Sequence, residues 1–366
     1  MKNSINLAGA FVGIIVGAGF GSGQEVMQFF TNFGIYSIPA VLIAMILFAF
    51  IGMQIAQLGS HIQSTSHKQI IHLICGRYLG TVIDFILTFF LFGVAVIMIA
   101  GAGSIGEQQF GIPSHIGAIV MTLLTITTLL LKVEKIISII SSVTPFLLII
   151  MMIIAGYSIF TNDFNLMEIE RFSIIEDAVS SNWIIGALLY VSFNIAVGFS
   201  MLSVMGGTLK NKKEAARGGI MGGLLLGLLL LLINCGMLAD LENIQGVELP
   251  TIYLANNISP LFGHILSIIL LAMIYNTCVG MLYAFTVRFI KADSPSYKLS
   301  VTVIGTIGFI SSFIGFTTLV GTIYPIMGYI GFILLTAVTL SWLRSTHHAY
   351  DVFEQPLSIE KIRRVS

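Results

Sequence analysis

Charged residues are scarce in this chain. They make up 9% of its 366 residues, whereas soluble domains carry about 25%, and the mean hydropathy is +0.98. An ordinary soluble domain is therefore excluded, and a polytopic protein of the lipid bilayer is predicted. The formal net charge is zero, so no basic surface for nucleic acid is expected.

Cysteine is also rare, and the distribution of reactive side chains excludes several classes of site. The three cysteines, Cys75, Cys235 and Cys278, lie far apart in the sequence, which fits neither a disulfide framework nor a metal-binding spacing. The apolar segments contain no Ser/His pair, no pair of aspartates and no His-Glu metal motif. We therefore expect a protein that is not an enzyme and has no resident cofactor.

Long apolar segments are abundant. A stretch of about 20 apolar residues is long enough to span a bilayer, and ten such spans are predicted, at residues 5–31, 39–60, 80–106, 114–131, 136–160, 183–208, 218–239, 261–288, 299–316 and 321–343. Because ten is even, both termini lie on one side. All lysines and arginines except Arg171 then fall on that side, which the positive-inside rule assigns to the cytoplasm. The expected protein is a multi-pass protein of the plasma membrane, with a cytoplasmic tail at 344–366.

The first span contains a run of glycine and polar residues, Gly17-Ala18-Gly19-Phe20-Gly21-Ser22-Gly23-Gln24-Glu25. A glycine costs about 1 kcal/mol relative to alanine in a helix interior, and an acid at bilayer depth costs at least about 2.5 kcal/mol. Ser22 and Glu25 have the spacing of a capping box, which would start a new helix inside the membrane. A helix interrupted at this depth must be buried in protein or line a cavity, and such helices form the binding sites of secondary transporters.

Two other interpretations of these glycines are open. From Gly9 to Gly21 a glycine recurs every four residues, as in a stripe that lets two helices approach closely. A packing stripe does not account for Gly19, Gly23 or the polar residues. A dinucleotide fingerprint is the less favoured alternative, because no strand precedes the glycines.

A second interruption is predicted in the sixth span, where Ser192, Asn194 and Gly198 place a hydroxyl, an amide and a glycine near the middle of the membrane. The spans that follow recur at offsets similar to those after the first span, which indicates an internal repeat. Residues 5–160 and 183–343 are therefore predicted to be two repeats of five spans. Because five is odd, the second repeat enters the membrane from the opposite side. The expected fold is all-α, a single transmembrane transport domain over 1–366, with ten spans in an inverted repeat and discontinuous first and sixth helices.

The eighth span also carries polar groups at bilayer depth, the amide of Asn276 and the hydroxyl of Thr277. This span corresponds to the third span of the first repeat. The two together are candidates to complete a cavity beside the interrupted helices.

The segment from Ala10 to Gly13 and the run from Gly17 to Glu25, in a chain of this length with ten spans, resemble the YkvI-like bacterial membrane proteins. These are similar to the amino acid–polyamine–organocation superfamily, which has the LeuT-type fold of five plus five inverted spans. The resemblance implies that a solute is held by the unwound parts of the first and sixth spans. In sodium-coupled relatives, a sodium ion lies between first-span carbonyls and eighth-span hydroxyls.

The resemblance is carried over to individual residues of this sequence. It points to Gly17, Gly19, Gly21, Ser22, Gly23, Ser192, Asn194 and Gly198 as solute-binding residues and to Thr277 as a sodium ligand. Glu25 and Asn276 are added as candidate solute-binding residues. The eighth span lacks an adjacent pair of hydroxyl residues, so a proton carried by Glu25 is an alternative to sodium, and transport without a coupling ion is another.

Two functions fit these observations. The first is a secondary active transporter of a small organic solute, such as an amino acid or a related compound, that works by alternating access and is coupled to Na⁺ or H⁺ as a symporter. The second is a permease-like receptor that binds a small ligand without net transport. Binding without flux in proteoliposomes would favour the receptor. The solute, the direction of transport and the oligomeric state do not follow from the sequence.

Overall fold

The structure is a computed structural model that describes residues 2–63, 67–130, 144–162, 166–291 and 294–347. Every element in this part of the chain is helical. In chain order the helices are α1 (Lys2–Ile15), α2 (Ala18–Ser22), α3 (Gln24–Phe29), η1 (Thr31–Tyr36), α4 (Ser37–Ile62), α5 (His67–Phe110), α6 (Ser114–Leu130), α8 (Thr144–Thr161), α9 (Leu166–Phe172), η3 (Ile175–Asp177), α10 (Trp183–Gly207), α11 (Lys212–Leu238), α12 (Leu241–Ile244), α13 (Pro250–Ile258), α14 (Pro260–Phe289), α15 (Tyr297–Ser312) and α16 (Phe316–His347).

The described helices include several that are long and apolar enough to cross a membrane. Five qualify singly, at Thr31–Ile62, Gly80–Phe110, Lys212–Leu238, Pro260–Phe289 and Phe316–Leu340. Two bent pairs raise the number to seven if each pair is one span, namely Pro145–Thr161 with Leu166–Phe172 and Trp183–Phe199 with Met201–Gly207. The prediction of an all-helical, multi-pass membrane protein is confirmed.

Three of the predicted spans do not meet this criterion. The first is divided among α1, α2 and α3. The ninth corresponds to α15, which has 16 residues and is about 24 Å long, less than the hydrocarbon thickness of about 30 Å. The fourth corresponds to α6, which is described as far as Leu130, the last residue before the gap at 131–143. Residues 136–143 of the fifth span and 348–366 of the predicted tail lie outside the described part. The count of ten spans stays a prediction.

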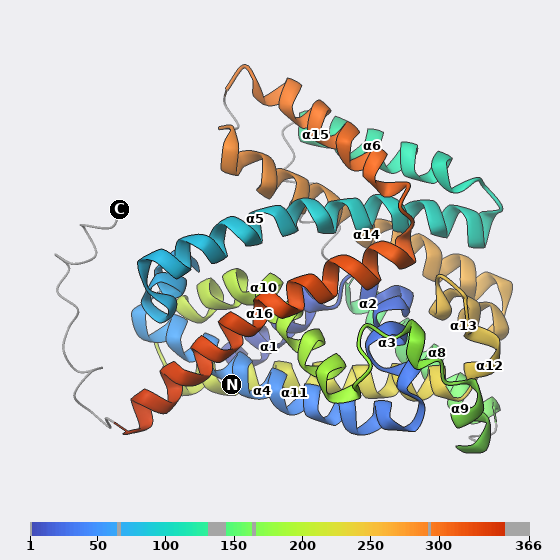
Figure 1. Cartoon of the computed structure of the whole chain (residues 1–366), viewed down its shortest axis with the longest axis horizontal. Helices are drawn as coiled ribbons and strands as arrows, with labels where there is room; N and C mark the ends of the chain where they lie inside the picture. Colours follow the sequence, from blue (N-terminus) through green and yellow to red (C-terminus); the bar gives the residue numbers. More distant parts are fainter. Residues whose placement is uncertain (1, 64–66, 131–143, 163–165, 292–293, 348–366) are drawn as a thin grey trace.

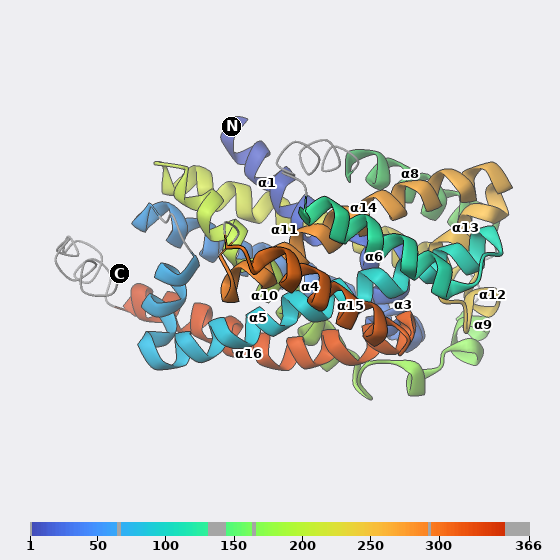
Figure 2. The same ribbon diagram turned by 90° about the horizontal axis from the view of Figure 1, so that it is seen from above.

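The helices that the two predicted repeats place in corresponding positions pack against each other. α4 packs on α11, α5 on α14, α6 on α15 and α1 on α10. The short helices α9, α12 and α13 gather at the end of the bundle opposite to the C-terminal end of α16 (Figures 1 and 2). The interrupted region between α1 and α3 lies inside the bundle, where Phe20, Ser22 and Glu25 are buried, and α13 packs on one side of it.

Helix α11 approaches its neighbours closely because glycines occupy its contact faces. A Cβ added to Gly219 would lie 2.5 Å from the carbonyl carbon of Gly52 in α4, and one added to Gly222 would lie 2.7 Å from the Phe11 ring in α1. Gly9 of α1 has no neighbour within 4 Å of that position. The close contact between α1 and α11 is thus made by glycines of α11, and Gly9 takes no part in it.

Substitution of Gly219 tests this packing. Gly219→Ala should lower the stability of the native state by about 1–3 kcal/mol, the usual cost of inserting a methyl group into a filled contact. The matched variant Gly9→Ala should be neutral or stabilising by up to about 1 kcal/mol, because alanine is the better helix former. Thermal unfolding of both variants in detergent is the measurement. Equal midpoints for the two would contradict the close approach of α11 to α4.

Candidate functional site

The backbone of the first predicted span leaves the helical conformation at two places. α1 ends at Ile15, and Gly17 is extended, with φ −102° and ψ −169°. α2 ends at Ser22, and the next residue, Gly23, has a φ of +81°, in the left-handed region that favours glycine. α3 then starts at Gln24. The glycine run thus separates three helical pieces, and carbonyl and amide groups at each junction have no partner within a continuous helix.

The capping box predicted at Ser22 and Glu25 is wrong. The Ser22 hydroxyl donates to the Gly19 carbonyl (2.8 Å) and accepts from the Gln24 amide (3.2 Å). Because Gly23 turns the chain into the left-handed conformation, Gly23 and not Ser22 is the N-cap of α3. The Glu25 carboxyl instead packs against Gly19, where any side chain would collide with it.

Glu25 is the centre of a small group of buried oxygen atoms. Its side chain is 5% exposed, and Tyr324 of α16 forms a side-chain hydrogen bond with it. Tyr190 of α10 also interacts electrostatically with Glu25, and its hydroxyl has no partner of hydrogen-bond geometry in the described part of the chain. The buried side chains of the described residues include no lysine, arginine or histidine. The carboxyl therefore has phenol oxygens near it and no fixed positive charge.

The side of the interruption toward α13 is covered. The Thr251 hydroxyl donates to the Gly21 carbonyl at 2.6 Å, and Thr251 also packs on Gly23. The side chain of Gln108 in α5 pairs with both the N–H and the C=O of Leu249, each at 3.0 Å. These bonds fix the start of α13 over the junction of α2 and α3.

The polar stretch predicted in the sixth span is helical. α10 continues through Ser192, Asn194 and Gly198, and the Asn194 side-chain amide donates to the Tyr190 carbonyl (3.0 Å), one turn earlier in the same helix. The two parts of α10 meet at a bend of 55° after Phe199, which is later in the chain than the predicted centre of the interruption.

Two residues of this stretch nevertheless face the neighbouring helices of the site. Ser192 is fully buried against α16, and its hydroxyl has no hydrogen-bond partner among the described residues. The position of a Cβ on Gly198 would lie 3.6 Å from Ile14 at the end of α1. α10 therefore borders the first helix where the latter is interrupted.

The candidates in the eighth predicted span, Asn276 and Thr277, lie in α14 beyond the point where this helix packs on the interruption. The side chain of α14 that packs on Gly21 is Leu270, about two helical turns before Thr277. Asn276 is half-buried, and its side-chain oxygen has no hydrogen-bond partner in the described part. Thr277 is half-buried as well. A sodium ion at Thr277 stays a prediction.

A cavity of about 280 Å³ lies on the other side of the interruption, among α1, α5, α10, α14 and α16. Its lining is apolar apart from Arg288 and includes Ile14, Phe90, Val94, Ala196, Met281 and Met327. Arg288 is paired with Asp84 at 2.6 Å. The cavity thus offers contact to an apolar body and no unpaired charge.

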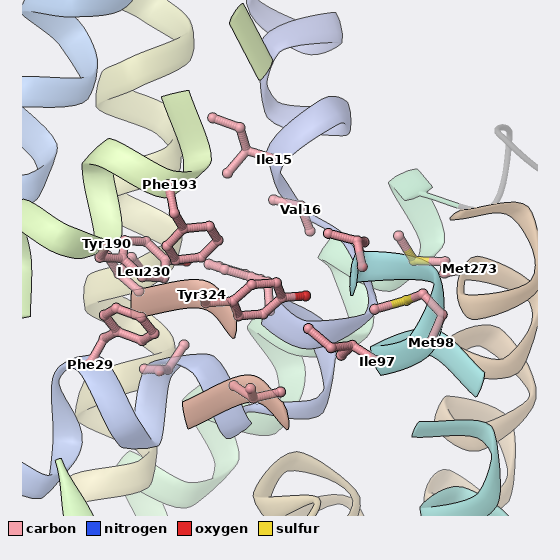
Figure 3. Close-up of a cluster of buried hydrophobic side chains, with 14 of the residues drawn as sticks. Ile15, Val16, Phe29, Ile97, Met98, Tyr190, Phe193, Leu230, Met273 and Tyr324 are labelled. Atoms are coloured by element: carbon pink, nitrogen blue, oxygen red, sulfur yellow. The ribbon is translucent and has the colours of Figure 1, made fainter. Parts of the chain in front are cut away.

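A pair of stacked aromatic rings lies beside Glu25. Phe193 and Tyr324 are stacked with their ring centres 4.6 Å apart and an angle of 3° between the ring planes. Each lies one helical turn before a residue that lines the cavity, Phe193 before Ala196 and Tyr324 before Met327. In Figure 3 the two rings lie beside each other, and the Tyr324 hydroxyl points away from Phe29 toward the side of Val16 and Ile97.

Sequence reasoning missed the partners of the interrupted helix. Tyr324 lies in α16 and Thr251 in α13, both far from the glycine run in the sequence. The signal for Tyr324 is a phenol followed by Pro325 inside an apolar span. No pattern in the sequence marks Thr251, because its partner is a backbone carbonyl.

Comparisons with known proteins agree with this fold. No family model matches the chain. It is 25% identical over 314 residues to the uncharacterized membrane protein YkvI of Bacillus subtilis (strain 168), covering 85% of this chain and 88% of that protein. It is 26% identical over 277 residues to the uncharacterized protein YyaD of the same strain, covering 76% of this chain and 78% of that protein. The chain is homologous to YkvI, and the resemblance inferred from the sequence is confirmed.

Solved structures similar to this chain include three transporters with the LeuT-type fold. MhsT, solved in complex with L-phenylalanine, has a TM-score of 0.61 and 14% identity, with 92% of this chain and 88% of that chain covered. Mhp1 in an inward-facing conformation has a TM-score of 0.59 and 13% identity, with 92% and 76% covered. A manganese transporter mutant from Eremococcus coleocola has a TM-score of 0.59 and 15% identity, with 90% and 76% covered. At these identities the likeness shows the fold.

Substitution of the glycine at the second junction tests the geometry of the interruption. Gly23→Ala should lower the stability by about 1–2 kcal/mol, because an L side chain is strained in the left-handed conformation and its Cβ would lie 2.8 Å from the Thr251 methyl group. Gly17→Ala is the control, since Gly17 is extended and the nearest atom to the new Cβ is 3.9 Å away. Thermal unfolding in detergent measures both. A Gly23→Ala variant as stable as the wild type would contradict the left-handed turn.

Proposed function

We propose that the protein is a secondary active transporter of a small organic solute and that it works by alternating access. In this proposal the chain crosses the plasma membrane ten times as an inverted repeat, with both termini in the cytoplasm and the interrupted first helix and bent α10 at its centre. The 280 Å³ cavity is then open toward the cytoplasmic side, and α13 closes the outer side.

The observation that carries the proposal is a group of buried polar side chains at the interrupted helix. α13 covers one side of this helix, and the 280 Å³ cavity lies on the other. The interruption brings Glu25 into the bundle core, and the hydroxyls of Tyr190 and Ser192 are buried without a hydrogen-bond partner in the described part. Buried polar atoms without partners cost free energy, and a polar ligand would offset that cost. In this proposal the stacked Phe193–Tyr324 pair separates these groups from the cavity and acts as a barrier that moves.

The predicted solute-binding residues have different parts in this proposal. Gly19, Ser22, Glu25 and Ser192 border the solute. Gly21 and Gly23 allow α13 and α14 to approach the interrupted helix, and Gly17 and Gly198 lie where α1 and α10 would change their angle. Asn194 supports α10, and Asn276 completes the site if α14 moves toward α2.

The coupling ion and the solute class belong to the same proposal. The LeuT-type fold is compatible with an amino acid or a related compound as solute. A proton carried by Glu25 is the coupling ion that the buried carboxyl favours, and sodium at Thr277 is the alternative.

Alternating access is tested by the labelling of a cysteine in the cavity. In a background without Cys75, Cys235 and Cys278, the variant Ala284→Cys places a thiol in the cavity lining. It should react with a membrane-impermeant maleimide only from the side of the C-terminal end of α16. A solute that the protein takes up in counterflow assays should slow this reaction several-fold, because the cavity closes in the outward-open state.

A cysteine at the exposed residue Ser296 is the matched control, which should react from the same side at a rate that solute does not change. Labelling of Ala284→Cys from both sides, or a rate unaffected by a solute that is taken up, would contradict alternating access. Protection of the thiol by a ligand that shows no counterflow would instead support the receptor.

A further inference from the structure

The surroundings of Glu25 restrict the charge of the solute, provided that the protein is the transporter proposed above. A carboxylate buried without a cation partner is costly, and ionisable residues within membrane-spanning segments are therefore normally paired or face a cavity. The buried side chains of the described residues offer no cation. The charge must therefore be neutralised by a proton on Glu25 or by a positive group that enters the site.

The elements packed against α3 supply no positive charge that could neutralise the Glu25 carboxylate. α10 contributes Tyr190 and α16 contributes Tyr324, while α2 contributes Gly19 and η1 has only the exposed Tyr36. The charged residues of α11 lie in its first turns, at 212–217. α11 meets this region through Asn234, which receives a hydrogen bond from Thr31 and is about 25 Å along the helix from Arg217.

Arg288 is the cation of the cavity wall, but it is not available to a solute carboxylate. Its guanidinium donates to the Asp84 carboxylate at 2.6 Å and to the Thr88 hydroxyl at 2.8 Å. A solute carboxylate would have to replace Asp84 there, and next to Glu25 it would meet a second negative charge. The fixed charges therefore disfavour a zwitterionic amino acid.

The neighbouring rings favour a cation with an apolar body. Tyr190 is surrounded by Phe29, Phe30 and Phe193, with ring centres 5.4, 4.9 and 5.3 Å away. Aromatic faces attract an ammonium group, and the phenol oxygens of Tyr190 and Tyr324 can accept its N–H groups. The adjoining cavity, lined by residues such as Phe90, Val94 and Met281, would receive an alkyl or aryl group.

We infer that the solute is a primary organic amine in its ammonium form, without a carboxylate, and that it binds to the Glu25 carboxylate in place of a proton. In this step the O–H bond of Glu25 breaks and the proton passes to solvent. The ammonium group then forms an ion pair with the carboxylate and takes over the hydrogen bond that Tyr324 makes in the empty site. Since one carboxylate holds either the proton or the amine, solute and proton are exchanged rather than carried together.

Phenethylamine and L-phenylalanine are a matched pair of probes, because they differ only in the carboxylate. Binding is measured with purified wild-type protein by thermal unfolding and by isothermal titration calorimetry in two buffers of different ionisation enthalpy. We expect phenethylamine to bind with release of about one proton per ligand and at least ten times more tightly than L-phenylalanine. 2-Phenylethanol, which lacks the charge, should not compete.

Variants assign the effect to Glu25. Glu25→Gln should weaken phenethylamine binding at least ten-fold, because an amide cannot give up a proton and pair with the ammonium group. The variant should unfold at or near the wild-type temperature, because an amide replaces a protonated carboxyl of the same shape. Tyr324→Phe keeps the ring that stacks on Phe193 and should weaken binding less. Glu107→Gln, at an exposed acid outside the cluster, should have no effect.

The outcomes separate this inference from the proposed function. Tighter binding of L-phenylalanine, equal binding by Glu25→Gln, no proton release, or no binding of any of the three probes would each overturn the inference. If L-phenylalanine binds more tightly and also shows counterflow, the inference fails and the proposed transport function stands. Conversely, phenethylamine binding that depends on Glu25 but gives no counterflow in proteoliposomes would support the site and contradict transport.

Discussion

The structure depends on one constraint, that an interrupted helix in an apolar bundle must have its backbone groups and its carboxyl satisfied from within the protein. Ser22 donates to the Gly19 carbonyl, and Thr251 donates to the Gly21 carbonyl from a helix more than two hundred residues later. Gly19 leaves room for the Glu25 carboxyl. The glycines are therefore places where other groups approach the backbone, and the positions of α13, α14 and α16 follow from these contacts.

The same constraint makes the two sides of the interruption different. Toward α13 the backbone is covered by hydrogen bonds from Thr251 and by the Gln108 pairing with Leu249. In the proposed mechanism the barrier toward the cavity is the stacked pair of Phe193 and Tyr324, and the Tyr324 hydroxyl is hydrogen-bonded to Glu25. A ligand at Glu25 would compete for this hydrogen bond, and occupancy of the site would then change the packing of the ring pair.

The helical membrane fold and the location of the interrupted first helix could be predicted from the sequence, because hydropathy and a run of alternating glycines are local signals. The groups that contact the interrupted helix could not be predicted. The prediction of a capping box at Ser22 failed because the left-handed turn at Gly23 moves the start of α3 to the residue after it. Gly23 packs against Thr251, a contact between residues far apart in the sequence. The interruption expected within residues 190–200 is a bend of 55° after Phe199, at the end of that stretch, while the Asn194 amide bonds within α10. Tyr324 and Tyr190 are joined to Glu25 by tertiary contacts that no sequence spacing encodes.

The most direct test of the account is a pair of distances between spin labels, measured by double electron–electron resonance with and without saturating phenethylamine. One pair, at Lys2 and Phe289, spans the cavity side, and the other, at Asn257 and His115, spans the side of α13. The account predicts that the ligand shortens the first distance and lengthens the second, and that Glu25→Gln abolishes both changes. Two unchanged distances in protein that has bound the ligand would contradict it.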